Sequence, residues 1–176
     1  MALALGTSPV DFTLPGVDGN DHSLDQYADK SALVVVFTCN HCPYALAWEP
    51  RLLEIQADYA EKGVQLIAIS ANDAEKYPAD SFPAMKDHAA NNNWNFPYLY
   101  DESQETARAY GAERTPEVFV FDNERTLAYH GKVDDNYEEP IAVEETYLRD
   151  ALDAILAGNA PAVTTTDPVG CTIKWK

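Results

Sequence analysis

Two short apolar runs rich in β-branched residues, separated by one stretch of helical pattern, restrict the possible folds of this chain most. Residues 32–37 read ALVVVF and residues 64–70 read VQLIAIS. Continuous apolar runs of this length are typical of strands buried on both faces. Residues 43–62 between them have apolar side chains at helical spacing, and Gly63 provides a common helix stop. This strand–helix–strand order predicts two parallel strands joined by a crossover helix, and hence an α/β fold.

The rest of the chain extends this pattern. A predicted hairpin turns around residues 16–19 and precedes the first buried strand. Strands at residues 114–122 and 126–133 are joined by a turn at Asn123 and Glu124, so they must be antiparallel and make the central sheet mixed. Further predicted elements are a helix at 81–91, an extended segment from 96–101, a short helix ending at Gly111, and an amphipathic helix at 143–158. Helices are therefore expected on both faces of the sheet.

The length of 176 residues suits a single domain with one substantial core. We divide it into an N-terminal hairpin extension (1–31), a core (32–158) and a C-terminal tail (159–176) that contains Cys171. No apolar run approaches the roughly 18 residues that span a bilayer. The first residues lack the basic start of a signal peptide and soon meet Pro9, so we expect a cytoplasmic protein.

The charge balance excludes two classes of partner. Asp and Glu number 29 against 12 Lys and Arg, a formal net charge of −17. Nucleic acids and anionic membranes would be repelled by such a surface, so neither is expected as a partner.

The stretch TCNHCP (residues 38–43) concentrates the reactive side chains of the chain. Cys39 falls where a buried strand gives way to a helix, and Cys42 follows one helical turn later, so the two sulfurs can approach bonding distance. Free amides and the dipole at a helix N-terminus stabilise a thiolate, as does His41 when protonated. We therefore expect a redox-active pair with Cys39 as the thiolate nucleophile.

From here the sequence resembles the thioredoxin-like superfamily, and within it the redoxin branch that includes alkyl hydroperoxide reductases and thiol-specific antioxidant proteins. The resemblance covers residues 6–158 and rests on SPVDFTLPGVDG, VVVFTCNHCP, VQLIAIS and the segment FPYLYDESQETARAYGAERTPEVFVFD. It implies a thioredoxin-like fold with an N-terminal β-hairpin extension. It also implies that Pro116 is a cis proline beside the cysteines and that the backbone of Thr115 contacts a bound partner.

Two features depart from the thioredoxin pattern. Asn40 and His41 stand between the cysteines where thioredoxins have Gly-Pro, and His41 resembles the residue found there in bacterial disulfide-oxidising proteins. The buried acid of many thioredoxins would fall on Leu33, so a proton relay is missing or is supplied from elsewhere.

Two redox activities remain open. Dithiol–disulfide exchange ranks first, because neither cysteine shows the Pro-x-x-x-Thr/Ser-x-x-Cys signature of peroxiredoxins. Peroxide reduction ranks second, since Cys42-Pro43 matches part of that signature and Arg114 lies near the expected arginine position. Either activity needs no organic cofactor, and the partners would be protein or small-molecule thiols and disulfides. A dithiol donor such as a thioredoxin system would supply electrons.

The third cysteine, Cys171, leaves several interpretations open. The alternatives are a third redox thiol that resolves a disulfide, an anchor for the tail, and an inert packed side chain. A Cys₃His zinc site made of Cys39, Cys42, Cys171 and a histidine is a further alternative, although structural zinc sites usually contain two short ligand pairs. For the whole chain, the last alternative is a binding module that keeps the fold but catalyses no reaction.

Overall fold

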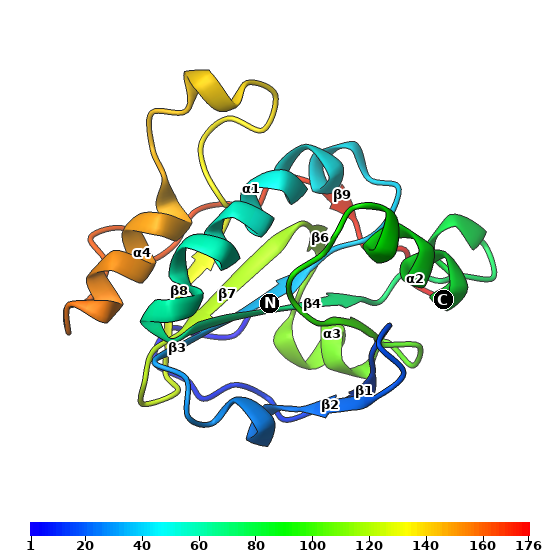
Figure 1. Cartoon of the computed structure of the whole chain (residues 1–176), viewed down its shortest axis with the longest axis horizontal. Helices are drawn as coiled ribbons and strands as arrows, with labels where there is room; N and C mark the ends of the chain where they lie inside the picture. The colour runs from blue at the N-terminus through cyan, green and yellow to red at the C-terminus, as the bar shows by residue number, and fades with distance from the viewer.

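A five-stranded mixed sheet forms the centre of the computed structural model, which describes residues 1–176 (Figure 1). The strand order is β5-β4-β3-β7-β8. β3 pairs parallel with β4, β4 parallel with β5, and the β7–β8 hairpin adds antiparallel to β3. The strands span Tyr98–Tyr100 (β5), Val64–Ser70 (β4), Ala32–Phe37 (β3), Glu117–Phe121 (β7) and Leu127–Gly131 (β8). The mixed α/β fold and the boundaries of both apolar strands are as predicted.

Helices cover both faces of this sheet, as Figure 1 shows. α1 (Pro43–Tyr59), α2 (Phe82–Asn91) and α4 (Tyr147–Leu156) place side chains such as Trp48, Met85 and Leu148 against one face. α3 (Glu105–Tyr110) and the N-terminal segment cover the other, where Phe12 and Tyr110 pack. Short 3-10 helices lie at Leu24–Tyr27, Ala60–Lys62, Pro78–Asp80 and Pro140–Ala142. The even-numbered side chains of β3 face one cluster and the odd-numbered ones the other, which explains its unbroken apolar run.

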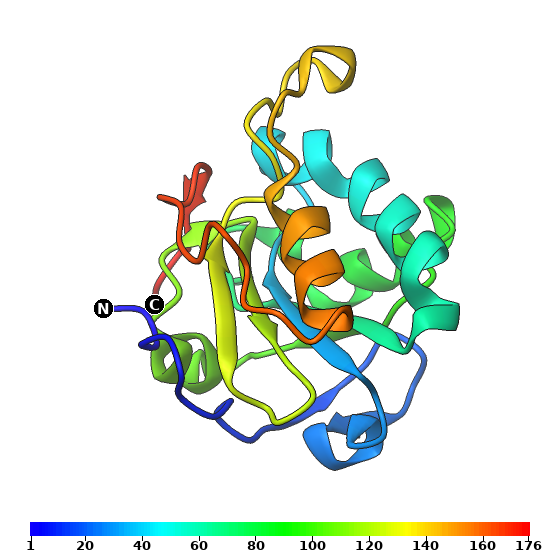
Figure 2. The same cartoon turned by 90° about the vertical axis from the view of Figure 1, so that its left-hand side faces the viewer.

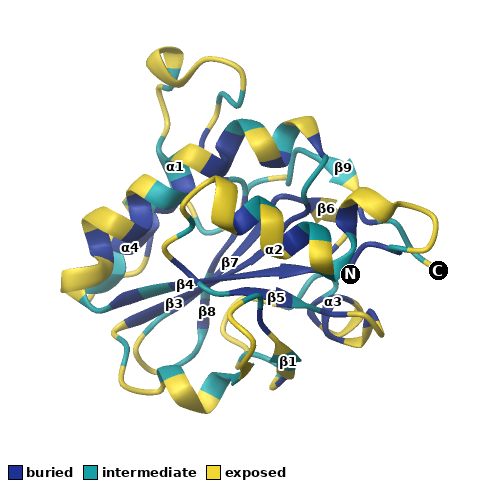
Figure 3. Ribbon diagram, turned by 45° about the vertical axis from the view of Figure 1, so that its right-hand side comes forward, coloured by how far each residue is buried: buried dark blue, intermediate teal, exposed yellow.

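The N-terminal hairpin is confirmed, with β1 (Thr13–Pro15) antiparallel to β2 (Asp21–Ser23). The last helix is shorter than predicted, because α4 begins at Tyr147 rather than at residue 143. Residues 134–146 instead form a loop that projects from the body with mostly exposed side chains (Figure 3). No helix has both the length and the apolar character needed to cross a bilayer.

The C-terminal tail forms structure that the sequence did not predict. Thr164 and Thr166 first exchange backbone hydrogen bonds with His130, which places the tail along the outer edge of β8 (Figure 2). The chain then turns, and β9 (Cys171–Thr172) pairs antiparallel with β6 (Arg114–Thr115). The tail therefore completes the end of the molecule where the first two cysteines lie.

Candidate active site

The first two cysteines lie at the junction of β3 and α1. Cys39 belongs to the loop after β3, and Cys42 is the N-cap residue of α1, with Pro43 in the first helical turn. Proline suits this place, because the amide it lacks would find no partner inside the helix. Cys39 and Cys42 pack together with Ala45 and are only 1% and 0% exposed. The predicted pair is therefore assembled, and it is buried.

Thr115 brings a distant part of the chain against both sulfurs. Its bond to Pro116 is cis, as the resemblance implies. When protonated, the Cys42 thiol donates a hydrogen bond to the Thr115 carbonyl oxygen at 3.3 Å, and Cys39 Sγ lies 3.7 Å from the Thr115 hydroxyl. The backbone and the side chain of Thr115 thus each contact one cysteine.

Cys171 joins this group through the β6–β9 pair. It stands opposite Thr115 in the register, and its side chain packs against the cluster that contains Cys42. Its thiol is within hydrogen-bonding reach of Cys42. Cys42 is therefore the central thiol, in contact with both of the others.

The electrostatics assign the thiolate to Cys42. A hydrogen bond from Cys39 lowers the pKa of Cys42 to about 4 despite burial, with further hydrogen bonds from Cys171, the Ala45 amide and Thr115. The pKa of Cys39 is raised by its hydrogen bond to Cys42, by burial and by the charge of Asp80. Burial and the neighbouring Cys42 raise the pKa of Cys171 to about 11.

This distribution differs from the expected thiolate at Cys39. The reason is the surroundings of each thiol: Cys42 is the N-cap residue of α1, beside the free amides of the first helical turn, whereas Cys39 faces the carboxylate of Asp80.

That carboxylate, Asp80, is a functional candidate that the sequence analysis missed. It is fully buried, its oxygens accept hydrogen bonds from the Asn40 amide (2.8 Å) and Asn72 (2.9 Å), and one lies 2.5 Å from His41 Nδ1. The His41 ring is not aligned for a hydrogen bond, so this contact is electrostatic when the ring is protonated. Leu33, which stands at the position of the buried acid of many thioredoxins, is a core residue of β3. The sequence shows only a proline-flanked acid before a helix, a weak signal.

The ligands of the alternative Cys₃His zinc site are not brought together. Around the cysteines, the metal-ligand atoms that lie within 4.8 Å of one another belong to Cys39, His41 and Asp80. The three cysteines and a histidine of a Cys₃His site are not gathered in this way.

The other three histidines and Arg114 have partners of their own. His22, His88 and His130 pair with Asp18, Glu49 and Glu117. The Arg114 guanidinium donates to the Gly170 carbonyl, and its charge acts on Cys171.

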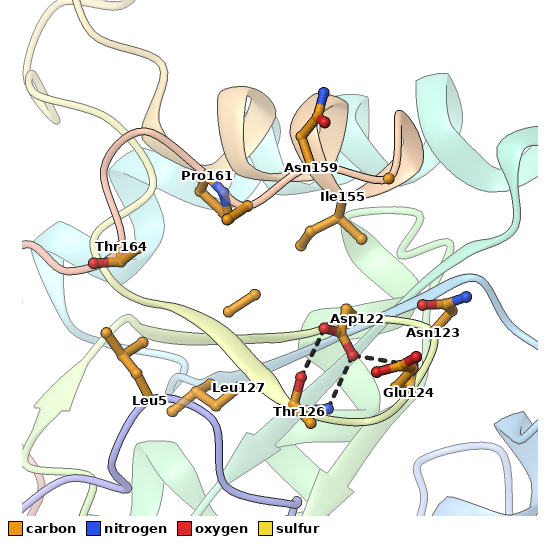
Figure 4. Close-up of a pocket in the computed structure, with 13 residues that line it drawn as sticks. Leu5, Asp122, Asn123, Glu124, Thr126, Leu127, Ile155, Asn159, Pro161 and Thr164 are labelled. Atoms are coloured by element: carbon orange, nitrogen blue, oxygen red, sulfur yellow. Dashed lines mark hydrogen bonds between the residues drawn. The ribbon is translucent and has the colours of Figure 1, made fainter.

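A surface cavity of about 430 Å³ lies away from the cysteines, between the β7–β8 turn and the end of α4 (Figure 4). Asp122 in its lining accepts hydrogen bonds from the Glu124 amide and from the amide and hydroxyl of Thr126. Those bonds fix the turn.

The comparisons with known proteins agree with this geometry. The family model described as Redoxin matches residues 5–147, most of the chain. The chain belongs to the Redoxin family. Two solved structures superpose over nearly the whole chain of this Redoxin. A hypothetical protein from Sinorhizobium meliloti is 38% identical, with a TM-score of 0.94 and coverage of 100% of this chain and 97% of that one. An uncharacterized conserved protein from Geobacillus kaustophilus is 41% identical, with a TM-score of 0.93 and coverage of 98% and 93%.

More distant relatives have functional names. The thiol-disulfide oxidoreductase ResA of Geobacillus thermodenitrificans is 25% identical over 123 residues, or 69% of this chain. That match spans 65% of the ResA chain. A putative thiol:disulfide interchange protein DsbE from Chlorobium tepidum is 25% identical, with a TM-score of 0.62 and coverage of 73% of this chain and 85% of that one. The thioredoxin-like fold with its N-terminal hairpin is thereby confirmed.

Proposed function

We propose that this Redoxin is a thiol–disulfide oxidoreductase in which Cys39 and Cys42 form the redox pair. The observation that supports the proposal most is the packing of Cys39 against Cys42 at the start of α1, with Thr115 in contact with both. The lowered pKa of Cys42 favours its thiolate. Thiolate is the reactive form in disulfide exchange, and a low-pKa thiolate is also a good leaving group. The names of the ResA and DsbE relatives agree with this chemistry.

The reaction interconverts a dithiol and a disulfide. When the pair is oxidised, one bond forms between Cys39 Sγ and Cys42 Sγ. A partner disulfide takes up the two electrons, together with one proton from Cys39 and one from solvent. The Thr115 hydroxyl and carbonyl position the sulfurs. His41 and Asp80 lie beside Cys39 and are proposed to handle its proton. The proposed partners are protein or small-molecule thiols and disulfides, with a dithiol protein such as a thioredoxin as the electron donor.

Peroxide reduction is the second candidate. A low-pKa cysteine followed by Pro43, with a second thiol in contact, favours it. The Cys42 thiolate would attack a hydroperoxide and become a sulfenic acid as the alcohol leaves, and Cys39 would then condense with it to a disulfide and water.

The test combines redox equilibration with turnover. In glutathione redox buffers, the wild-type protein is expected to form a Cys39–Cys42 disulfide, and Cys39→Ser and Cys42→Ser to lose it. Cys42→Ser, which removes the low-pKa thiol, is also expected to lose turnover of hydroxyethyl disulfide with a dithiol donor. Absence of that disulfide in the oxidised wild-type protein would contradict the proposal. Rapid hydroperoxide consumption that persists in Cys39→Ser but not in Cys42→Ser would instead support the peroxidase.

A further inference from the structure

The edge of β6 beside the cysteines is already occupied by the chain's own tail. Besides the β6–β9 pair, the Ile173 amide donates to the Glu113 carbonyl at 2.9 Å. An extended polypeptide binds an open strand edge through such backbone hydrogen bonds. With β9 in place, a partner cannot add to this edge.

The tail is fixed on both sides of Cys171. Before it, Thr164 and Thr166 are bonded to β8 through His130. After it, Ile173 is 3% exposed in the core. The Lys174 backbone amide and carbonyl are bonded to Asn72, Asp73 and Gln104. Cys171 is therefore held beside Cys42.

Access to the three thiols is unequal. Cys39 and Cys42 are buried, whereas Cys171 is partly exposed. Of the three cysteines, Cys171 is therefore the one that external thiols and disulfides can approach from solvent.

From this arrangement we propose that Cys171 is the catalytic thiol that exchanges with external partners, and that Cys42 passes the disulfide between Cys171 and Cys39. This relay rests on the proposed redox function of the Cys39–Cys42 pair. Its partners are thiols and disulfides that approach Cys171 end-on, such as low-molecular-weight thiols, rather than peptides laid along β6.

Reduction of the oxidised protein then proceeds in three balanced exchanges. In the oxidised protein Cys42 carries no charge, so it no longer raises the pKa of Cys171. The Cys171 thiolate attacks Cys42 Sγ, the Cys39–Cys42 bond breaks, and Cys39 leaves and takes up the proton lost by Cys171. An external thiolate attacks Cys171 Sγ and expels Cys42, whose low pKa makes it a good leaving group. A second external thiolate attacks the partner sulfur of that mixed disulfide, which releases the external disulfide and Cys171. In total, two external thiols are oxidised and one protein disulfide is reduced.

Disulfide mapping by mass spectrometry tests the order of the thiols. Cys39→Ser, oxidised with glutathione disulfide, is expected to form a Cys42–Cys171 bridge. Because Cys42 is the central thiol, Cys42→Ser is expected to form no bridge between Cys39 and Cys171. In the wild-type protein, acid quenching during reduction by glutathione should capture the Cys42–Cys171 bridge transiently, which checks the result without a substitution at the pair.

The rate of reduction tests the role of Cys171. Oxidised Cys171→Ser and Cys171→Ala are expected to be reduced by glutathione about tenfold or more slowly than wild type. Thr172→Ala, a change at the exposed neighbour on the same strand, should react like wild type.

Two outcomes would overturn the relay while leaving the proposed function intact. One is wild-type reduction rates in both Cys171 variants. The other is slow reduction without any Cys42–Cys171 bridge in either bridge experiment, because Cys171 would then be only structural. Failure of the wild-type protein to form a Cys39–Cys42 disulfide would instead remove the proposed function itself.

Discussion

At the scale of single residues, Cys42 is the position where most interactions of the site converge. It caps α1, contacts Cys39 and Cys171, and faces Thr115. Each hydrogen bond that the Cys42 sulfur accepts favours its ionised form, and together these bonds outweigh the cost of burying a charge. His41, between the two cysteines, is not among the groups that lower the pKa of Cys42, because its partner is the buried Asp80.

We expect the reduced protein to show a thiolate that titrates near pH 4, visible as the ultraviolet absorbance of the ionised sulfur. Cys42→Ser should abolish this titration. Since the folded pKa lies below the ordinary thiol value of 9.0, the thiolate stabilises the reduced fold fully above pH 9 and progressively less toward pH 4. The difference in unfolding free energy between wild type and Cys42→Ser should therefore grow as the pH rises. A titration that follows Cys39 instead would contradict the assignment.

At the scale of elements, the contact between β6 and β9 joins the tail to the active site. Gly170 makes this approach possible, because a Cβ there would collide with the Thr115 carbonyl oxygen. The same oxygen faces Cys42. Packing of the tail and geometry of the redox pair are therefore coupled through a single peptide group.

Gly170→Ala is expected to destabilise the fold by about 1–3 kcal/mol, because either the tail or Thr115 must move. The measurements are chemical denaturation and amide hydrogen exchange, in which the Ile173 amide should lose protection. Thr172→Ala is the matched control and should change stability by less than about 0.5 kcal/mol. Unchanged protection of Ile173 in Gly170→Ala would show that the strand pair tolerates a side chain.

At the scale of the whole molecule, a strongly acidic surface surrounds a two-sided core. Several buried acids have a basic partner, as in the Arg51–Asp134 and His130–Glu117 pairs. The remaining excess of acidic groups, which sums to −17, repels itself across the surface. This repulsion opposes the compact state and is screened by salt.

Sodium chloride should therefore raise the thermal unfolding midpoint at pH 7, with most of the gain reached by about 0.5 M as the screening length shortens. The same salt series near pH 4.3, the isoelectric point from the sequence, should produce little change, because the net charge is then close to zero. A midpoint at pH 7 that is independent of salt would contradict this account.

The sequence by itself determined the central strands, their parallel order, the N-terminal hairpin and the position of the first two cysteines at the start of a helix. These features follow from local patterns: unbroken apolar runs, helical spacing, and Gly and Pro at turns. Only the tertiary structure decided that Cys42 holds the charge, that Asp80 lies beside Cys39 and that Cys171 completes the group. Each of these depends on contacts between segments far apart in the chain. The pKa of a thiol and the pairing of a two-residue strand arise from neighbours that no local pattern specifies.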